Sequence, residues 1–262
     1  MALNRKSTVS LICRRLGPVV LGALSLVSCQ TEAAVGFQAA TLSQATLAAL
    51  VHPSFLVDPQ TAERYRQQGL AYRQQGDLER AIAALKIAAA LDPQNPNSSV
   101  ILGWTQHLAG YRAPAAEALQ AALRQNPDNV PALNALGIVY LVDGQLDAAV
   151  ATHIRAADLQ PGNEIAHYNL SLAYERLGQA NQAIAQAQTA TELEPGNPHP
   201  WVALALAYWA NGDQAAAEAP YRQALGLDGG YGSREYLNHL EQAGFSPEQI
   251  ETTEAIRQRV RD

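Results

Sequence analysis

The sequence predicts an all-α protein built as a solenoid of stacked helix pairs, and a 34-residue period is the main observation behind this prediction. Glycine, alanine and proline each recur in a fixed phase of that period: Gly76, Gly110, Gly144, Gly178 and Gly212; Ala81, Ala115, Ala149, Ala183 and Ala217; and Pro93, Pro127, Pro161 and Pro195. A fixed period of this length is typical of architectures in which each unit packs mainly on its neighbours. The composition agrees, because Ala and Leu are abundant while Phe occurs three times and Met once, which favours helices packed through small side chains.

Glycine and proline mark where the two helices of each unit end. In residues 130–163 the first helix is expected to stop at Asp143-Gly144, since glycine readily takes the left-handed conformation of a tight turn. The second helix is expected to end before Pro161, which cannot extend it. The same reading along the chain predicts five full units, at residues 62–95, 96–129, 130–163, 164–197 and 198–231.

The first 28 residues have the pattern of a signal peptide. Four basic residues and no acidic one precede an apolar stretch at 16–28, which is shorter than the roughly 20 residues of a membrane span. The stretch ends in Leu26-Val27-Ser28-Cys29, which resembles the bacterial lipobox and implies lipid chains on Cys29. Gln30 resembles the residue found in lipoproteins of the outer membrane. We therefore expect export and anchoring that faces the periplasm; the alternatives are a secretory signal cut near residues 33–34, which gives a secreted protein, or an uncleaved anchor.

Both ends of the repeat array are expected to be capped. Residues 29–61 are predicted to form a tether and then an N-terminal half-repeat over 43–51, with a disordered linker as the alternative. Residues 232–262 are predicted to form C-terminal capping helices: a further first helix at 233–243, and a mostly polar helix from Ser246-Pro247 to about Val260. Ile250 and Ile256 are its few expected apolar contacts, so this helix is expected to be a solvated end cap.

The units resemble the tetratricopeptide repeat. In the third unit the family's signature positions hold Leu133, Leu136, Gly137, Tyr140, Ala149, Ala156 and Pro161. Small residues at these positions let neighbouring helices approach closely, so we assign them to packing. The resemblance implies a right-handed superhelix whose first helices line a concave face, and it implies a scaffold or adaptor that binds other proteins.

No residue pattern indicates an enzyme, and we predict no catalytic residue, no cofactor and no metal site. The six histidines show no metal-ligand spacing, and neither a Gly-rich phosphate loop nor a nucleophile motif is present. The two cysteines, Cys13 and Cys29, fall within the first 29 residues. Without the four basic residues of the leader, 14 basic residues remain against 24 acidic ones, which is no electrostatic footprint for nucleic acid.

The predicted site is a groove along the concave face, where the partner is expected to be a protein or peptide. Transferring the family's face by position gives Arg66, Leu70 and Arg73 from the first unit; Val100, Trp104 and His107 from the second; Asn134, Ile138 and Leu141 from the third; Tyr168, Leu172 and Glu175 from the fourth; and Val202, Leu206 and Trp209 from the fifth.

This face begins polar and becomes apolar from the second unit onward, which favours a helix or extended peptide with apolar side chains. Trp104 and Trp209 are its expected anchors. Relatives that grip the carboxyl tails of heat-shock chaperones use Lys and Asn here, whereas Leu70, Trp104 and Ile138 hold the central positions in this sequence. The alternatives are that the tether, the end helices or a second copy covers the strip, the last giving a structural homo-oligomer.

Overall fold

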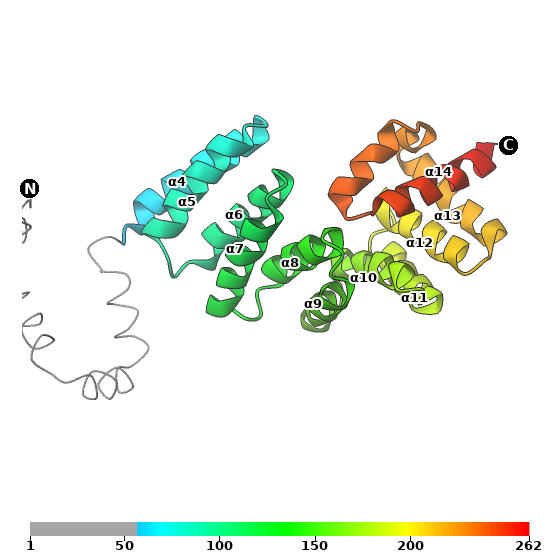
Figure 1. Ribbon diagram of the computed structural model, residues 1–262, viewed down its shortest axis with the longest axis horizontal. Coiled ribbons are helices and arrows are strands. Elements are labelled where there is room, and N and C mark those ends of the chain that lie inside the picture. Colours follow the sequence, from blue (N-terminus) through cyan, green and yellow to red (C-terminus); the bar gives the residue numbers. More distant parts are fainter. Residues whose placement is uncertain (1–56, 262) are drawn as a thin grey trace, which may run out of the picture. The chain divides into compact units, whose positions relative to one another are not determined.

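The computed structural model describes residues 57–261, and all regular structure in that range is helical (Figure 1). The chain divides into two units at residue 56, and only the second is described here. The predicted leader, Cys29, the tether and the half-repeat over 43–51 lie outside the described residues. The elements are α4 (Pro59–Gln74), α5 (Leu78–Leu91), α6 (Pro96–Leu108), α7 (Arg112–Gln125), α8 (Val130–Val142), α9 (Leu146–Leu159), α10 (Glu164–Arg176), α11 (Ala180–Leu193), α12 (Pro198–Ala210), α13 (Gln214–Leu227), the 3₁₀ helices η2 (Gly229–Gly232) and η3 (Tyr236–Ala243), and α14 (Pro247–Arg261).

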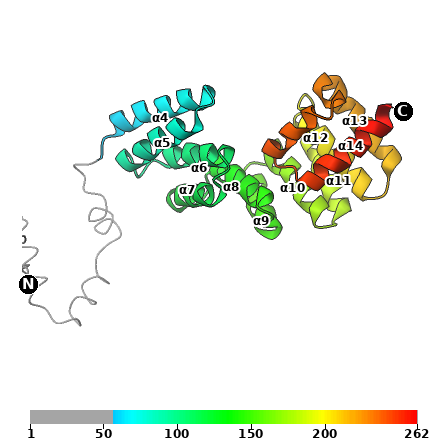
Figure 2. The same ribbon diagram turned by 45° about the horizontal axis from the view of Figure 1, so that its top comes forward.

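The helices from α4 to α13 pack as five successive hairpins, which confirms the predicted all-α fold of stacked helix pairs (Figures 1 and 2). Each hairpin contacts the next, and the first helices α6, α8, α10 and α12 contact one another in turn. The first helices therefore present one shared face, as the repeat pattern predicted. Of the helices between residues 57 and 261, none combines the length and apolar character needed to cross a membrane.

The turns inside the hairpins depend on glycine. Gly76, Gly110, Gly144, Gly178 and Gly212 all have φ between 72° and 83°, which confirms the predicted left-handed turn. A residue with a Cβ atom would be strained in this conformation. Side chains of Asp or Asn cap the starts of several helices, for example Asn129, whose Oδ1 accepts the Ala132 N–H at 3.0 Å at the start of α8.

Glycine also sets how closely the two helices of a unit approach. A Cβ atom added at Gly69 would lie 2.7 Å from Leu85 Cγ, and one at Gly103 would lie 2.6 Å from Leu119 Cγ. In the third unit the same position is Gly137, and the ring against it belongs to His153, which is fully buried. The small residues of the repeat pattern therefore have the packing role that the sequence indicated.

The C-terminal segment departs from its prediction in two ways. Residues 236–243 form the 3₁₀ helix η3 rather than an α-helix. The helix α14 does begin with the expected reciprocal cap, since Ser246 N–H donates to Gln249 Oε1 at 2.9 Å and Gln249 N–H donates to Ser246 Oγ at 3.2 Å. Ile250 and Ile256 are buried as predicted, but so are polar side chains of α14, among them Glu254 and Arg257.

Those polar side chains are buried because they find partners within the fold. Arg257 makes two hydrogen bonds of 2.7 Å to Glu254 and a third, of 3.1 Å, to the carbonyl of Gly232. A buried charge tolerates desolvation only when it is paired in this way. The helix α14 packs on α12, α13 and η3, so it is an integral part of the core rather than a solvated end.

Candidate binding groove

An apolar groove of about 370 Å³ opens on the face shared by the first helices. Its wall is formed by Arg73 from α4, by Val100, Ile101 and Trp104 from α6, by Pro131, Asn134, Ala135 and Ile138 from α8, and by Ile165 from α10. Arg73 is the only charged residue among them. The structure therefore brings together, in a single groove, Arg73, Val100, Trp104, Asn134 and Ile138 of the predicted concave face.

The repeat explains why these side chains meet. Val100 and Trp104 are four residues apart, and so are Asn134 and Ile138, which places each pair on one face of its helix. The two pairs are also separated by one 34-residue period, so α6 and α8 turn equivalent faces toward the groove. Apolar side chains on adjacent helices therefore line one concave, mostly apolar site, which is the usual character of a binding site.

The polar side chains of Asn134, in the groove, and of Arg66, beside it, are occupied by hydrogen bonds and ion pairs with other residues of the repeat array. The side-chain amides of Asn134 and Asn163 hydrogen-bond to each other reciprocally, at 3.2 and 3.0 Å, and Asn163 also caps α10 through the Ala166 N–H. Arg66 pairs with Glu63, approaches Asp92 at 3.7 Å and donates to Ser98 Oγ at 3.0 Å. Arg66 therefore joins the first unit to the second. Arg66 and Leu70, both half-buried, do not line the groove.

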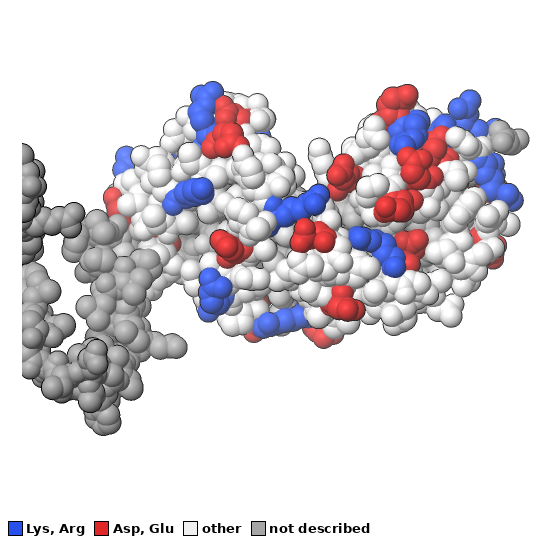
Figure 3. Space-filling view, in the orientation of Figure 1, with Lys and Arg blue, Asp and Glu red and all other residues white. Residues whose placement is uncertain are grey.

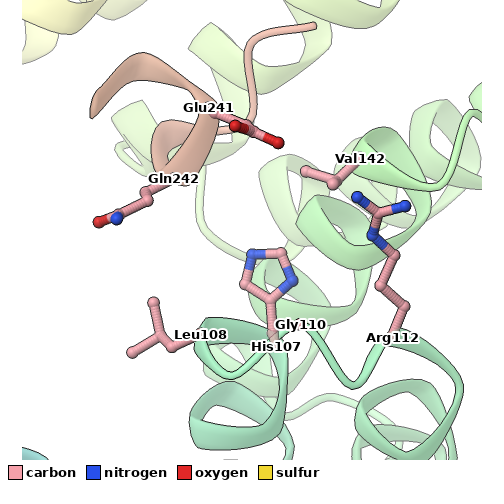
Figure 4. A pocket seen from close by; sticks show the side chains of 7 residues that line it. All are labelled: His107, Leu108, Gly110, Arg112, Val142, Glu241 and Gln242. Carbon is pink, nitrogen blue, oxygen red and sulfur yellow. The ribbon is translucent and has the colours of Figure 1, made fainter. Parts of the chain in front are cut away.

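His107 lies beside the groove, in a smaller cavity of about 160 Å³ (Figure 4). Its ring stacks on that of Trp104, with centroids 5.1 Å apart. Figure 4 shows the ring of His107 between Arg112 and the residues Glu241 and Gln242 of η3. Burial and the nearby charge of Arg112 lower the pKa of His107. A neutral ring in this place supports the orientation of Trp104 through apolar stacking.

The C-terminal part of the predicted groove is closed by the chain itself, which corrects the assignment of Leu141, Tyr168, Leu172, Glu175, Val202, Leu206 and Trp209 to a partner-binding surface. Leu141, Leu172 and Leu206 are at most 1% exposed, and they belong to one core cluster with Leu240 and Phe245 of the C-terminal segment. Trp209 is half-buried against the same cluster. Of the alternatives that the sequence left open, coverage by the end segment holds for this part of the face.

Directed hydrogen bonds fix the covering segment. Tyr168 donates its hydroxyl proton to the carbonyl of Ala243 at 3.2 Å. The Gln249 side-chain amide donates to the carbonyl of Leu172 at 3.1 Å and to Glu175 Oε2 at 2.6 Å. Burial raises the pKa of Glu175, while the hydrogen bond from Gln249 acts in the opposite direction. Periodicity could not reveal this closure, because the covering residues lie outside the repeat.

Two features of this region went unrecognised in the sequence. Pro131 and Ile165 line the groove and are one period apart, so the repeat phase could have identified them. The spacing of His199 and His239 along the chain gave no sign that they meet, but their rings lie 5.6 Å apart where α12 meets η3. Burial is the main cause that lowers the pKa of His199 to about 4. Within residues 57–261 no group of three or more side chains of the kinds that bind metals comes together.

Charge gives the face drawn in Figure 3 little selectivity. On the face shown in Figure 3, Lys and Arg are scattered among Asp and Glu, and no basic patch gathers there. Such a mixed surface favours solubility over the binding of a highly charged polymer. The feature that suggests selective binding is therefore the apolar groove, with Arg73 as the one charged residue in its wall.

Solved structures with a similar fold are repeat proteins. The crystal structure of a MamA protein is 26% identical to this chain, covers 65% of this chain and 93% of its own, and has a TM-score of 0.56. MamA from Desulfovibrio magneticus RS-1 is 22% identical over 64% of this chain and 96% of its own, with a TM-score of 0.58. TTC0263, a thermophilic TPR protein of Thermus thermophilus, is 22% identical over 76% of this chain and 99% of its own, with a TM-score of 0.57. At 22% identity the last two show the fold alone. None of the curated proteins matches the sequence.

Three sequence models of tetratricopeptide repeats match the chain. They cover residues 69–110, 118–151 and 168–231, which lie in the array of hairpins except for the last four residues of the third match, beyond α13. The matched residues, the 34-residue period, the left-handed turn glycines and the stacked hairpins agree with one another. The chain is a tetratricopeptide repeat protein.

Proposed function

We propose that this protein is a non-enzymatic scaffold that binds an apolar helix or extended peptide of a partner protein in the groove between α4, α6, α8 and α10. The observation that carries the proposal is the apolar wall of the groove, formed by the half-buried Val100 and Trp104 together with Ile138, which is 6% exposed. Side chains of this kind on a concave face are the usual anchors for an amphipathic helix or an extended segment. Tetratricopeptide repeats are protein-interaction modules, which supports the same conclusion.

Site-specific photo-crosslinking tests this assignment. A photoreactive residue is placed at Val100 or at Asn134 in the groove, and for comparison at Ile154, which is 39% exposed on α9. Adducts with partner protein are expected from the two groove positions and not from Ile154. They are expected to disappear when Ile138→Asp places a carboxylate in the apolar wall.

A matched tryptophan pair separates loss of the site from loss of the fold. Trp104→Ala removes an indole from the groove, whereas Trp201→Ala removes one from a different surface hollow, lined by Tyr208 and Pro220 among others. Only Trp104→Ala is expected to reduce adduct yield, with the far-UV circular dichroism of both variants kept. Equal adduct yield from Ile154, or equal loss in both tryptophan variants, would show that the groove is not the binding site. Light scattering on the same samples detects the alternative occupant, a second copy.

The proposed setting is the bacterial envelope, with the chain anchored through lipid on Cys29 and facing the periplasm, the outer membrane being the favoured location. The support is the sequence alone: the basic leader, the apolar stretch and Leu26-Val27-Ser28-Cys29. Mass spectrometry of the mature N-terminus should find an acylated Cys29, and Cys29→Ala should release the protein from the membrane fraction. An unmodified N-terminus near residues 33–34 would instead indicate a secreted protein.

A further inference from the structure

Two arginines on one face of α4 have contrasting surroundings. Arg66 and Arg73 are seven residues apart, which is two helical turns. Arg66 is provided with anionic and polar partners, namely Glu63, Asp92 and Ser98. Arg73 lines the groove, and its guanidinium makes no hydrogen bond or ion pair with any residue in 57–261. The only charge in an otherwise apolar wall is therefore left without a counter-ion in the described part of the chain.

The fold itself shows what this repeat position does when a segment lies on the concave face. Glu175 is three periods after Arg73 and occupies the equivalent position of the fourth unit. There the first turn of α14 lies against α10, and Gln249 donates to Glu175 Oε2 at 2.6 Å while Phe245 is buried in the adjoining cluster. The residue at this repeat position, Glu175, thus hydrogen-bonds to a polar side chain of the covering C-terminal segment, and the apolar side chain of Phe245 packs nearby. In the first unit the residue is a cation, so the complementary group is an acceptor that carries negative charge.

We propose that the segment bound in the open groove is an amphipathic segment of another protein, in which a Glu or Asp side chain pairs with Arg73 while apolar side chains pack on Trp104 and Ile138. This inference rests on the proposed function and specifies the chemistry of the partner. The chain's own N-terminal segment fits that description less well, because Glu32 is the single acidic residue in positions 1–57. Charge complementarity of this kind fixes the register of a peptide as well as adding affinity.

Selection from a phage-displayed library of random 16-residue peptides on the full chain tests the proposal. Recovered peptides are expected to carry Asp or Glu at a fixed spacing from a Leu or aromatic residue. The same selection on Arg73→Gln is expected to lose the acidic preference and keep the apolar one. Recovery of the same acidic preference on Arg73→Gln, or no acidic preference on the unaltered chain, would overturn the role of Arg73.

Calorimetry on a recovered peptide then measures how much the contact between Arg73 and the acidic side chain of the peptide contributes to the affinity. Arg73→Gln should weaken the affinity about tenfold, which corresponds to about 1.4 kcal/mol. A peptide with Lys in place of its acid should bind the unaltered chain equally poorly and regain affinity for Arg73→Glu. Arg124→Gln is the matched control, since Arg124 is exposed on α7 and lines no part of the groove.

The two levels of the proposal fail differently. Peptides that bind Ile138→Asp as tightly as the unaltered chain, or a library that yields no binder, would remove the groove and the inference together. Peptides that need Ile138 but are indifferent to Arg73, with no rescue by the charge swap, would remove only the inference. In that case the groove would bind apolar segments without selecting for charge.

Discussion

Replacing His153 with Leu should stabilise the protein and remove part of its sensitivity to acid. His153 is fully buried against Gly137, and neither ring nitrogen has a hydrogen-bond partner. The equivalent positions in the first two units hold Leu85 and Leu119 against Gly69 and Gly103. Leucine therefore already occupies this place twice in the same fold. Removing unsatisfied buried polar atoms should raise the free energy of unfolding by about 1–3 kcal/mol at pH 7.

The pH dependence follows from burial. Desolvation lowers the pKa of His153 from 6.5 to about 3, so the folded protein holds this ring neutral at pH 5 while the unfolded chain protonates it. Because the unfolded state binds more protons, stability falls as the pH drops below 6.5 and continues to fall until about pH 3. At pH 5 the difference of 1.5 units from 6.5 amounts to about 2 kcal/mol. His153→Leu should therefore exceed the unaltered protein in stability by about 2 kcal/mol more at pH 5 than at pH 7.

Urea unfolding followed by circular dichroism at pH 7, 6 and 5 measures this difference. The reciprocal change Leu119→His provides the matched control, because it places a histidine against Gly103 in the second unit, as His153 lies against Gly137 in the third. That variant should be less stable at pH 7 and should lose further stability toward pH 5. A gap between His153→Leu and the unaltered protein that stays constant from pH 7 to pH 5 would refute the buried, neutral state of His153.

Three further predictions concern the turns, the helix contacts and the C-terminal cap. Gly144→Ala should lower the free energy of unfolding by about 1–2 kcal/mol in a thermal measurement, because φ at Gly144 is 77°. Gly162→Ala should lower it clearly less, because φ is not positive there and the added Cβ would meet nothing within 4 Å. Gly103→Ala should cost about 1–3 kcal/mol in urea unfolding, because its Cβ would lie 2.6 Å from Leu119 Cγ, and combining it with Leu119→Ala should recover part of that cost. Arg257→Met should lower the free energy of unfolding by about 3–5 kcal/mol and speed proteolysis of α14, since it removes the cation beside the buried Glu254 and leaves that carboxylate the hydrogen bond from Gln258. The double change with Glu254→Gln should be less harmful, and equal harm would contradict the pairing argument.

The sequence was sufficient for the repeat array because each of its signals is local and recurs. A glycine at the same phase requires the same left-handed turn five times, and a small residue at the same phase permits the same close contact. The open part of the groove followed from the same logic, since Trp104 and Ile138 occupy one phase of adjacent units. Periodicity carries this information without any knowledge of long-range contacts.

The closed part of the groove could not be predicted in the same way. The segment that covers it has no counterpart in the repeat, and its contacts reach far back along the chain, as in the bond from Gln249 to Glu175. A polar composition suggested that α14 is solvated, but Arg257 and Glu254 satisfy each other and are buried. The meeting of His199 with His239 has the same origin, because it depends on how η3 packs on α12.

The C-terminal segment also gives the array an uneven resistance to local opening. In a solenoid each unit is stabilised mainly by its neighbours, and hydrogen exchange reports how readily each one opens. The fourth and fifth units are bound together by η3 and α14, and the same core cluster reaches Leu141 at the end of α8, whereas no comparable clamp holds the first two units within the described residues. Amides of α4 to α7 should therefore exchange first. The open groove lies in this more labile half, so a bound segment that bridges α4, α6 and α8 would slow exchange there and act as the missing clamp.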